Sequence, residues 1–234
     1  ACLRLREYDH ALGYARRAVE FSDSLDDDAT PSLKAQASLG IVLRSLQQHT
    51  TALPYLEQAE AHYSHVKINH SDYSHIEILR NLAASSAAEG NTETATSYYE
   101  RALKLSQNDD NPTERAGTYR DLGILFAGEN EHKKAIEQWS TALRLYERID
   151  DYARMARLYN DIANLRREMG EYIWAMKDFE KALTTINLAD DPETRGIVLA
   201  NAAVAYIDDG DIETAEAFMV EAIQLAQQID DRRA

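Results

Sequence analysis

Several features that are common in globular proteins are scarce in this chain of 234 residues. It has one cysteine, four prolines and nine glycines, and no apolar run approaches the roughly 18 residues that a membrane span needs. The single cysteine, Cys2, excludes an intrachain disulfide framework and hints at a reducing compartment. Strand-type runs of Val, Ile and Thr are also missing, so the composition favours an all-helical protein.

Basic residues are in the minority, with 25 Lys and Arg against 40 Asp and Glu and a formal net charge of −15. This charge disfavours nonspecific binding to nucleic acids and anionic membranes. The chain has no GxGxxG or GxSxG motif, no phosphate-binding P-loop and no plausible Cys/His dyad, so it predicts no enzyme and no cofactor. The N-terminus lacks the layout of a signal peptide, which favours a cytoplasmic location.

What the chain has instead is an internal repeat. Two alanines seven residues apart return six times, at Ala11/Ala18, Ala52/Ala59, Ala95/Ala102, Ala135/Ala142, Ala175/Ala182 and Ala215/Ala222. Successive first alanines are 41, 43, 40, 40 and 40 residues apart. A fixed period of this length is typical of one supersecondary unit stacked many times.

The unit around Ala175 shows how each repeat is built. Apolar residues from Leu158 to Met169 fall on one helix face. Gly170 follows, where a helix end needs a left-handed backbone conformation, and a second helical stripe begins at Tyr172. We therefore expect two antiparallel helices joined by a tight turn. The same turn position carries Gly90, Asn130 and Gly210 in other units.

Two aligned columns predict how these helices pack. Small residues let helix backbones approach closely, and one position of each first helix is always small: Gly40, Ala83, Gly123, Ala163 and Ala203. A large apolar residue usually lies between the paired alanines, where it can wedge against the neighbouring hairpin: Leu56, Tyr99, Trp139, Phe179 and Met219. Core packing is expected, with a ligand cage as the alternative, for the aromatic residues Tyr98, Tyr99, Trp139, Tyr172, Trp174 and Phe179.

The joints between units carry paired aspartates. The pairs begin at Asp26, Asp109, Asp150, Asp190 and Asp230. We expect each pair to cap the next helix, because a carboxylate accepts from unpaired N–H groups and suits the positive helix end. The joint between Tyr63 and Ile76 has no such pair, which predicts a longer and less regular loop there.

These columns resemble the tetratricopeptide repeat (TPR) family. The resemblance rests on the small residue of the first helix, the turn Gly170-Glu171-Tyr172, the alanine pair and the aromatic residue between the alanines. The 40-residue period is similar to the long-helix variety in MalT- and Rap-type regulators, kinesin light chains and LGN/Pins adaptors. It implies an all-α, right-handed superhelical solenoid of antiparallel helix hairpins with about eleven helices. Arg166 and Ser86 depart from it at usually apolar positions, and Ala15 replaces the first wedge.

On this pattern the whole chain, 1–234, is a single TPR solenoid. The predicted units are a half-repeat 1–30 and full repeats at about 31–72, 73–111, 112–151, 152–191 and 192–231. Neither end shows the polar cap expected of a terminal repeat, which predicts a fragment of a longer protein.

The resemblance also implies a function, which is to hold a peptide or partner protein in the concave groove lined by the first helices. Asn and Asp can bind a peptide's backbone amides, and arginines can clamp carboxylates, so we expect a partner with acidic or carboxylate groups. The residues expected to bind it are Arg80, Asn81, Arg120, Asp121, Arg157, Asn160, Asp161, Asn164, Arg167 and Asn201. Ser38 and Arg44 occupy neighbouring groove positions. The alternative is that these residues bond between adjacent repeats or only solvate a face.

Other functions stay open. The chain could be a ligand-sensing regulatory arm of a multidomain signalling or transcription regulator, or a self-assembly module that pairs through exposed solenoid ends. A histidine cluster around the irregular loop is a weak metal candidate, because imidazole binds zinc, copper or nickel. Its members are His62, His65, His70 and His75. No Cys pair or HExxH motif accompanies them, so a solvated loop is favoured.

Overall fold

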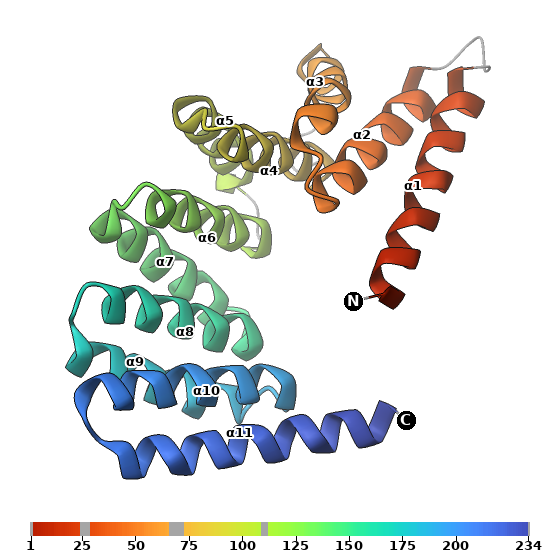
Figure 1. The fold of residues 1–234 in the computed structure, drawn as a ribbon. Coiled ribbons are helices and arrows are strands. Elements are labelled where there is room, and N and C mark those ends of the chain that lie inside the picture. The colour runs from red at the N-terminus through yellow and green to blue at the C-terminus, as the bar shows by residue number, and fades with distance from the viewer. Residues whose placement is uncertain (1, 24–28, 66–72, 109–111, 234) are drawn as a thin grey trace. The chain divides into compact units, whose positions relative to one another are not determined.

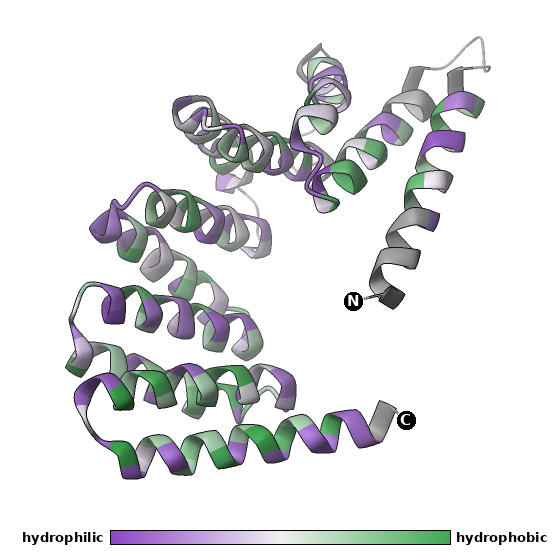
Figure 2. Cartoon of the chain, in the orientation of Figure 1, coloured by the Kyte–Doolittle hydropathy of each residue, from purple (hydrophilic) through white to green (hydrophobic). Residues whose placement is uncertain are grey.

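The computed structural model describes residues 2–23, 29–65, 73–108 and 112–233. These residues form eleven α-helices and one short 3-10 helix, with no strand among them, which confirms the predicted all-α fold (Figure 1). The irregular joint at 66–72 lies outside the described residues. Each described helix carries both polar and apolar residues (Figure 2), and none in these ranges is long and apolar enough to cross a membrane.

The chain divides into two compact units, Ala1–Leu125 and Phe126–Ala234. The first holds α1 (Cys2–Asp23), α2 (Ala29–Ser45), α3 (His49–His65), α4 (Tyr73–Ala88), α5 (Thr92–Leu105), η1 (Ser106–Asn108) and most of α6 (Thr113–Gly128). The second holds the end of α6, α7 (His132–Glu147), α8 (Tyr152–Glu168), α9 (Tyr172–Ile186), α10 (Pro192–Asp209) and α11 (Ile212–Arg233).

Both units are built from helix hairpins. In the first unit α2 packs on α3 and α4 on α5, while α1 contacts α2 and α3 contacts α4. In the second unit α8 packs on α9 and α10 on α11, while α7 contacts α8 and α9 contacts α10. The predicted turn residues have left-handed φ angles of 80° at Gly90, 59° at Asn130, 76° at Gly170 and 91° at Gly210. The hairpin prediction is therefore confirmed in its turn chemistry as well as its helices.

The alanine pairs lie at helix contacts, as their spacing predicts. Every alanine of the pairs from Ala52/Ala59 to Ala175/Ala182 is fully buried. The first pair differs, because Ala11 is half-buried and Ala18 is exposed. In that helix it is Ala15 that joins the apolar cluster of α2 and α3, so α1 packs through a different face.

The small residue of the first helix, Gly40 in this repeat, lets α2 and α3 lie very close together. A Cβ atom on Gly40 would lie 2.6 Å from Leu56 Cγ and 3.3 Å from the Leu56 backbone nitrogen. In three other repeats the column carries alanine beside a different wedge residue, namely Tyr99, Phe179 or Met219. The size allowed in this column therefore depends on the wedge that faces it.

Aspartate caps confirm the predicted role of two joints. Asp151 Oδ1 accepts from Arg154 N at 3.0 Å, and Asp191 Oδ1 accepts from Thr194 N at 3.0 Å. An Asx side chain in this position satisfies a helical N–H that has no backbone partner.

The other aspartates of these pairs behave differently. Asp150 and Asp190 have left-handed φ angles of 52° and 50°, which a short polar side chain tolerates better than most. The pairs at Asp26 and Asp109 lie outside the described residues. Asp230 and its neighbour lie inside α11 rather than at a helix start, so no cap forms there.

The departure at Arg166 is explained by a buried carboxylate on the facing helix. Arg166 of α8 bonds to Asp178 of α9, which is 3% exposed and also accepts from Lys181 Nζ at 2.9 Å. Forty residues later the same two positions hold Tyr206 and Phe218, whose rings meet edge to face with centroids 5.4 Å apart. An ion pair thus occupies the place of an aromatic pair.

The expectation of core packing is wrong for two of the aromatic residues. Tyr99, Trp139 and Phe179 are buried as expected, whereas Tyr172 is 38% and Trp174 is 55% exposed. The helical period explains the difference, because the inward face of α9 starts at Ala175. Trp174 precedes that face by about 100° of helical rotation.

Substitution of Gly40 tests the close approach of α2 and α3. Gly40→Ala should lower the free energy of unfolding by about 1–3 kcal/mol, because the added methyl overpacks against Leu56. Gly128→Ala is the control, since nothing lies within 4 Å of a Cβ there and alanine favours the helix by up to about 1 kcal/mol. Urea denaturation followed by circular dichroism measures both. An unchanged midpoint for Gly40→Ala would contradict the packing described.

Exchange of the buried ion pair for the aromatic pair tests the account of Arg166. Asp178→Ala should cost about 3 kcal/mol, because it leaves a poorly solvated guanidinium without its carboxylate. The double variant Arg166→Tyr/Asp178→Phe copies Tyr206 and Phe218 and should recover most of that loss. Thermal unfolding measures both. A double variant no more stable than Asp178→Ala would show that the two positions are not interchangeable between repeats.

Candidate functional site

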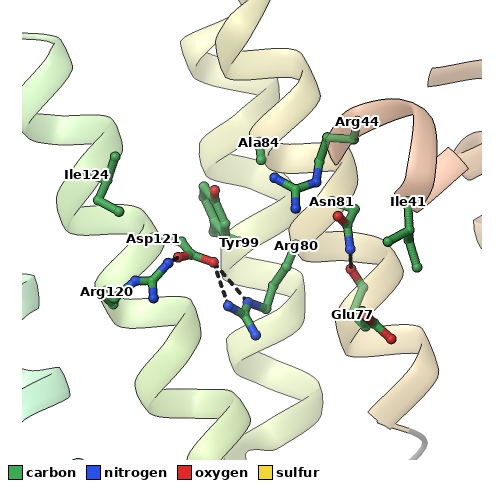
Figure 3. A pocket seen from close by; sticks show the side chains of 10 residues that line it. All are labelled: Ile41, Arg44, Glu77, Arg80, Asn81, Ala84, Tyr99, Arg120, Asp121 and Ile124. Atoms are coloured by element: carbon green, nitrogen blue, oxygen red, sulfur yellow. Dashed lines mark hydrogen bonds and ion pairs between the residues drawn. The ribbon is translucent and has the colours of Figure 1, made fainter. Parts of the chain in front are cut away.

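A pocket of about 350 Å³ opens on the face of the first unit that the first helices line (Figure 3). Its walls come from α2, α4 and α6, and from one residue of α5. The lining residues are Ile41, Arg44, Glu77, Arg80, Asn81, Ala84, Tyr99, Arg120, Asp121 and Ile124. The pocket therefore gathers the four predicted binding residues of this unit: Arg80, Asn81, Arg120 and Asp121.

Arg80 joins α4 to α6. Its Nε and Nη2 donate to Asp121 Oδ2 at 3.0 and 2.7 Å, and its Nη1 donates to Glu114 Oε2 at 2.9 Å. Burial lowers the pKa of Arg80, but the attraction of Asp121 and then of Glu114 outweighs burial and raises the pKa overall. The guanidinium is therefore charged, and its donors are directed at carboxylates of its own chain.

A glycine makes room for this arginine. A Cβ atom on Gly117 of α6 would lie 2.9 Å from Arg80 Nη2 and 3.0 Å from Arg80 Cζ. Any larger residue at this position would displace the guanidinium from Asp121 and Glu114. The local sequence of α6 thus selects the ion-paired position of Arg80.

Arg44 of α2 lies in the same pocket but differs from Arg80 in its hydrogen bonding. Its side chain is directed into the pocket (Figure 3), and its buried Nε has no hydrogen-bond partner among the described residues. A buried donor without a partner costs about 1–3 kcal/mol, so native proteins rarely keep one without a reason. Arg44 therefore has unused bonding capacity in this pocket.

Tyr99 closes the base of the pocket. It is 3% exposed, and burial, followed by the negative charge of Asp121, raises its pKa far above the usual range. The hydroxyl is therefore protonated at all physiological pH values and can donate a hydrogen bond. Asn81 Nδ2 donates to the Glu77 carbonyl of its own helix at 2.7 Å, so its oxygen is the part that faces other groups.

The predicted residues of the second unit form polar contacts between α8 and α10. Asn201 Nδ2 donates to Asn160 Oδ1 at 2.9 Å, and Arg167 Nη1 donates to Asp208 Oδ2 at 3.1 Å. Asn164 is half-buried and makes no side-chain hydrogen bond to the described residues. Most of this set therefore connects adjacent repeats, which is the alternative that the sequence left open.

Arg157 and Asp161 complete that set. Arg157 Nε donates to Thr194 Oγ1 at 3.0 Å and its Nη2 to Asp191 Oδ2 at 2.9 Å, so it holds the start of α10. Asn160 Nδ2 lies 3.5 Å from Asp161 Oδ1. Arg157, Asn160 and Asp161 thus all make contacts within the chain.

The sequence contains a signal for these bonds that residue type alone does not reveal. Arg80 bonds carboxylates 34 and 41 residues later, at Glu114 and Asp121. The same separations recur for Arg157 with Asp191 and for Asn160 with Asn201. A polar residue followed by a carboxylate or amide at one of these two spacings is therefore a candidate for a contact between successive first helices.

The histidine cluster does not form a metal site in the part of the chain that the structure describes. His75 stacks on Tyr63 with ring centroids 5.1 Å apart, and its Nε2 lies 3.7 Å from Glu60 Oε1. His62 is half-buried in α3, the side chain of His65 is not described, and His70 lies outside the described residues.

Comparison with known families agrees with the repeats seen in sequence and structure. A family model described as tetratricopeptide repeat matches residues 74–148. A second model with the same description matches residues 156–185 and 198–229. The chain belongs to the tetratricopeptide repeat family. A comparison with curated protein sequences gives no match.

Solved structures share the TPR fold at low sequence identity. BtubC (BKLC) from P. vanneervenii is 21% identical with a TM-score of 0.79, over 95% of this chain and 92% of that one. A putative kinesin light chain of Podosopora anserina with TPR-like repeats is 16% identical with a TM-score of 0.68, over 86% of this chain and 97% of that one. The quorum sensor NprR of B. thuringiensis is 12% identical with a TM-score of 0.74, over 97% and 62%.

Substitution of Arg44 or Arg80 in the TPR pocket should show which of the two arginines supports the fold and which is available to a ligand. Arg44→Met should leave the free energy of unfolding unchanged or raise it by up to about 1 kcal/mol, because it removes an unsatisfied buried donor. Arg80→Met should lower it by about 2 kcal/mol, because Asp121 and Glu114 lose their partner. Urea titrations of the two variants give both values. Equal destabilisation would show that Arg44 also supports the fold.

Proposed function

We propose that the chain is a protein-binding scaffold that holds an extended peptide along the face formed by the first helices. TPR folds generally serve as scaffolds rather than catalysts, and the proposal requires no reaction step. In the first unit we assign the anchoring role to the pocket of Arg44, and the ligand group to a side-chain or C-terminal carboxylate. The observation that carries this assignment is the buried Arg44 Nε, which has no hydrogen-bond partner among the described residues.

A carboxylate fits the groups around Arg44. A guanidinium binds a carboxylate through two parallel hydrogen bonds, and a protonated tyrosine hydroxyl adds a further donor. Tyr99 supplies that hydroxyl, and Arg120 adds positive charge on the α6 side of the pocket. Ile41 and Ile124 provide apolar walls for the methylene groups of the ligand residue.

The pairing of the charges in the pocket determines which arginine is available to an anion. Asp121 is bonded by Arg80 at 2.7 Å and by Arg120 Nη2 at 2.9 Å, so its charge is already balanced. Arg44 has no such partner among the described residues. Because Glu77 also lines the pocket, attraction for an anion comes from the Arg44 guanidinium itself and not from an excess of positive charge in the pocket or in the chain, whose net charge is −15.

A ligand-sensing arm is the second candidate function. The observation that favours it is the position of Arg80, which both lines the pocket and joins α4 to α6. A ligand carboxylate that replaced Asp121 at Arg80 would loosen this join and alter the packing of the two helices. Under this alternative the Arg80 Nε–Hε resonance shifts on ligand binding, and an unchanged resonance would refute it. Self-association stays a prediction from the sequence.

A peptide titration tests the anchoring role. The probe is a fluorescein-labelled peptide of alternating Glu and Ala, followed by fluorescence anisotropy at low salt. Arg44→Gln should weaken its binding about tenfold, since a bidentate charged contact is lost. Arg16→Gln, which removes the same charge at an exposed site on α1, should change the affinity less than about twofold.

The matched neutral peptide has Gln in place of every Glu. It should bind at least about tenfold more weakly than the acidic probe to the wild-type chain. If both peptides bind alike, or if Arg16→Gln weakens binding as much as Arg44→Gln, the pocket is not a carboxylate anchor.

A further inference from the structure

The start of α9 exposes three consecutive large side chains. Tyr172, Ile173 and Trp174 are 38%, 64% and 55% exposed. The equivalent positions of other repeats are mostly polar or charged, at 92–94, 132–134 and 212–214. Repeat packing therefore does not require large apolar residues at all three positions, and a run of this kind on a surface calls for another explanation.

The indole of Trp174 is held in place although it is exposed. Lys177 Nζ lies 4.6 Å from the ring centroid, and Arg166 Cζ lies 5.6 Å from it. Arg166 is itself fixed by its bond to the buried Asp178. Two cations beside the ring restrict its motion, so little side-chain freedom remains to be lost when a partner binds.

Positive charge continues from Trp174 along α9. A hollow of about 400 Å³ is lined by Lys177, Lys181 and Tyr159, together with Glu180, Thr184 and Thr185. Lys181 Nζ bonds to Asp178, whereas Lys177 forms no ion pair with any described residue. The nearby acids are Glu171, 4.0 Å from Arg166 Nε, and Glu180, which accepts from Tyr206 at 3.5 Å.

We propose that this α9 surface, defined by Ile173, Trp174, Lys177 and Lys181, is a second docking site. Its occupant is an amphipathic segment of a partner protein that carries apolar side chains and carboxylates on one face. The apolar side chains would pack on Ile173 and Trp174, and a carboxylate would meet Lys177. Charge complementarity selects this occupant, because Lys177 is a cation that forms no ion pair with the described residues of a strongly acidic chain.

The composition of the surface supports docking in a further way. Tryptophan is enriched among the residues that dominate binding energy, and aromatic residues are enriched in interface cores. The site is independent of the pocket in the first unit, because it shares no residue with it. Failure of one proposal therefore leaves the other standing.

Trp174 supplies its own probe for the test. The chain has two tryptophans, and Trp139 is buried. In the variant Trp139→Phe, all tryptophan fluorescence therefore comes from Trp174. The ligand probe is a synthetic amphipathic peptide of Leu, Ala and Glu, compared with a counterpart that has Lys in place of every Glu. The acidic peptide should shift the emission to the blue with saturation, and the basic peptide should not.

Matched variants locate the binding. Ile173→Gln should weaken the acidic peptide about tenfold, and Lys177→Gln about fivefold. The controls are Val220→Gln, at another exposed apolar residue, on α11, and Lys104→Gln, at an exposed lysine of α5. Both controls should leave the affinity unchanged.

Other outcomes overturn the proposal. Equal binding of the basic peptide would show that the surface does not select carboxylates. A mass that rises with concentration in sedimentation, and that Ile173→Gln abolishes, would identify a second copy of the chain as the occupant. A blue shift with anionic lipid vesicles but not with the acidic peptide would identify a membrane surface instead.

Discussion

The close approach of paired helices is the constraint on which the structure depends. Buried alanines such as Ala95 and Ala102 bring one helix against the next with no side chain beyond Cβ between them. At Gly40 even a Cβ would collide with Leu56. Because native interiors are close-packed, the wedge residue of each repeat must match the small residue that faces it. The repeat period of the sequence follows from this pairing, and so does the spacing of every polar group that the helices carry.

That spacing decides what the polar groups can do. Successive first helices place residues 34 and 41 positions apart within bonding distance, as Arg80 with Glu114 and Asp121 shows. Polar residues on this face therefore have two uses, which are to connect repeats or to bind a ligand. Arg80, Arg157 and Arg167 are used in the first way. Arg44 differs from them because it forms no ion pair with any described residue, and its buried Nε has no acceptor among those residues.

The features that the sequence predicts well depend on local backbone geometry or on small size. Gly170 in a left-handed turn, Asp191 as a cap and Ala175 in the core each follow from one residue and its neighbours. The features it predicts poorly depend on long side chains that choose among partners. Arg166 appeared out of place until Asp178 was found facing it, and the exposure of Trp174 could not be inferred from its aromatic character. The same holds for the candidate site. The positions of its polar residues along the first helices could be predicted, whereas the hydrogen-bond partners of their side chains could not.

The central claim is that the arginines of the first-helix face differ in bonding state, with Arg80 committed to the fold and Arg44 available to a carboxylate. Side-chain nitrogen spectroscopy of arginine-labelled protein observes both Nε–Hε groups at once, with and without the Glu–Ala peptide. We expect the Arg44 resonance to shift and its hydrogen exchange to slow when the peptide is added, while Arg80 stays slow and unshifted. A shift at Arg80 with no change at Arg44 would contradict the account.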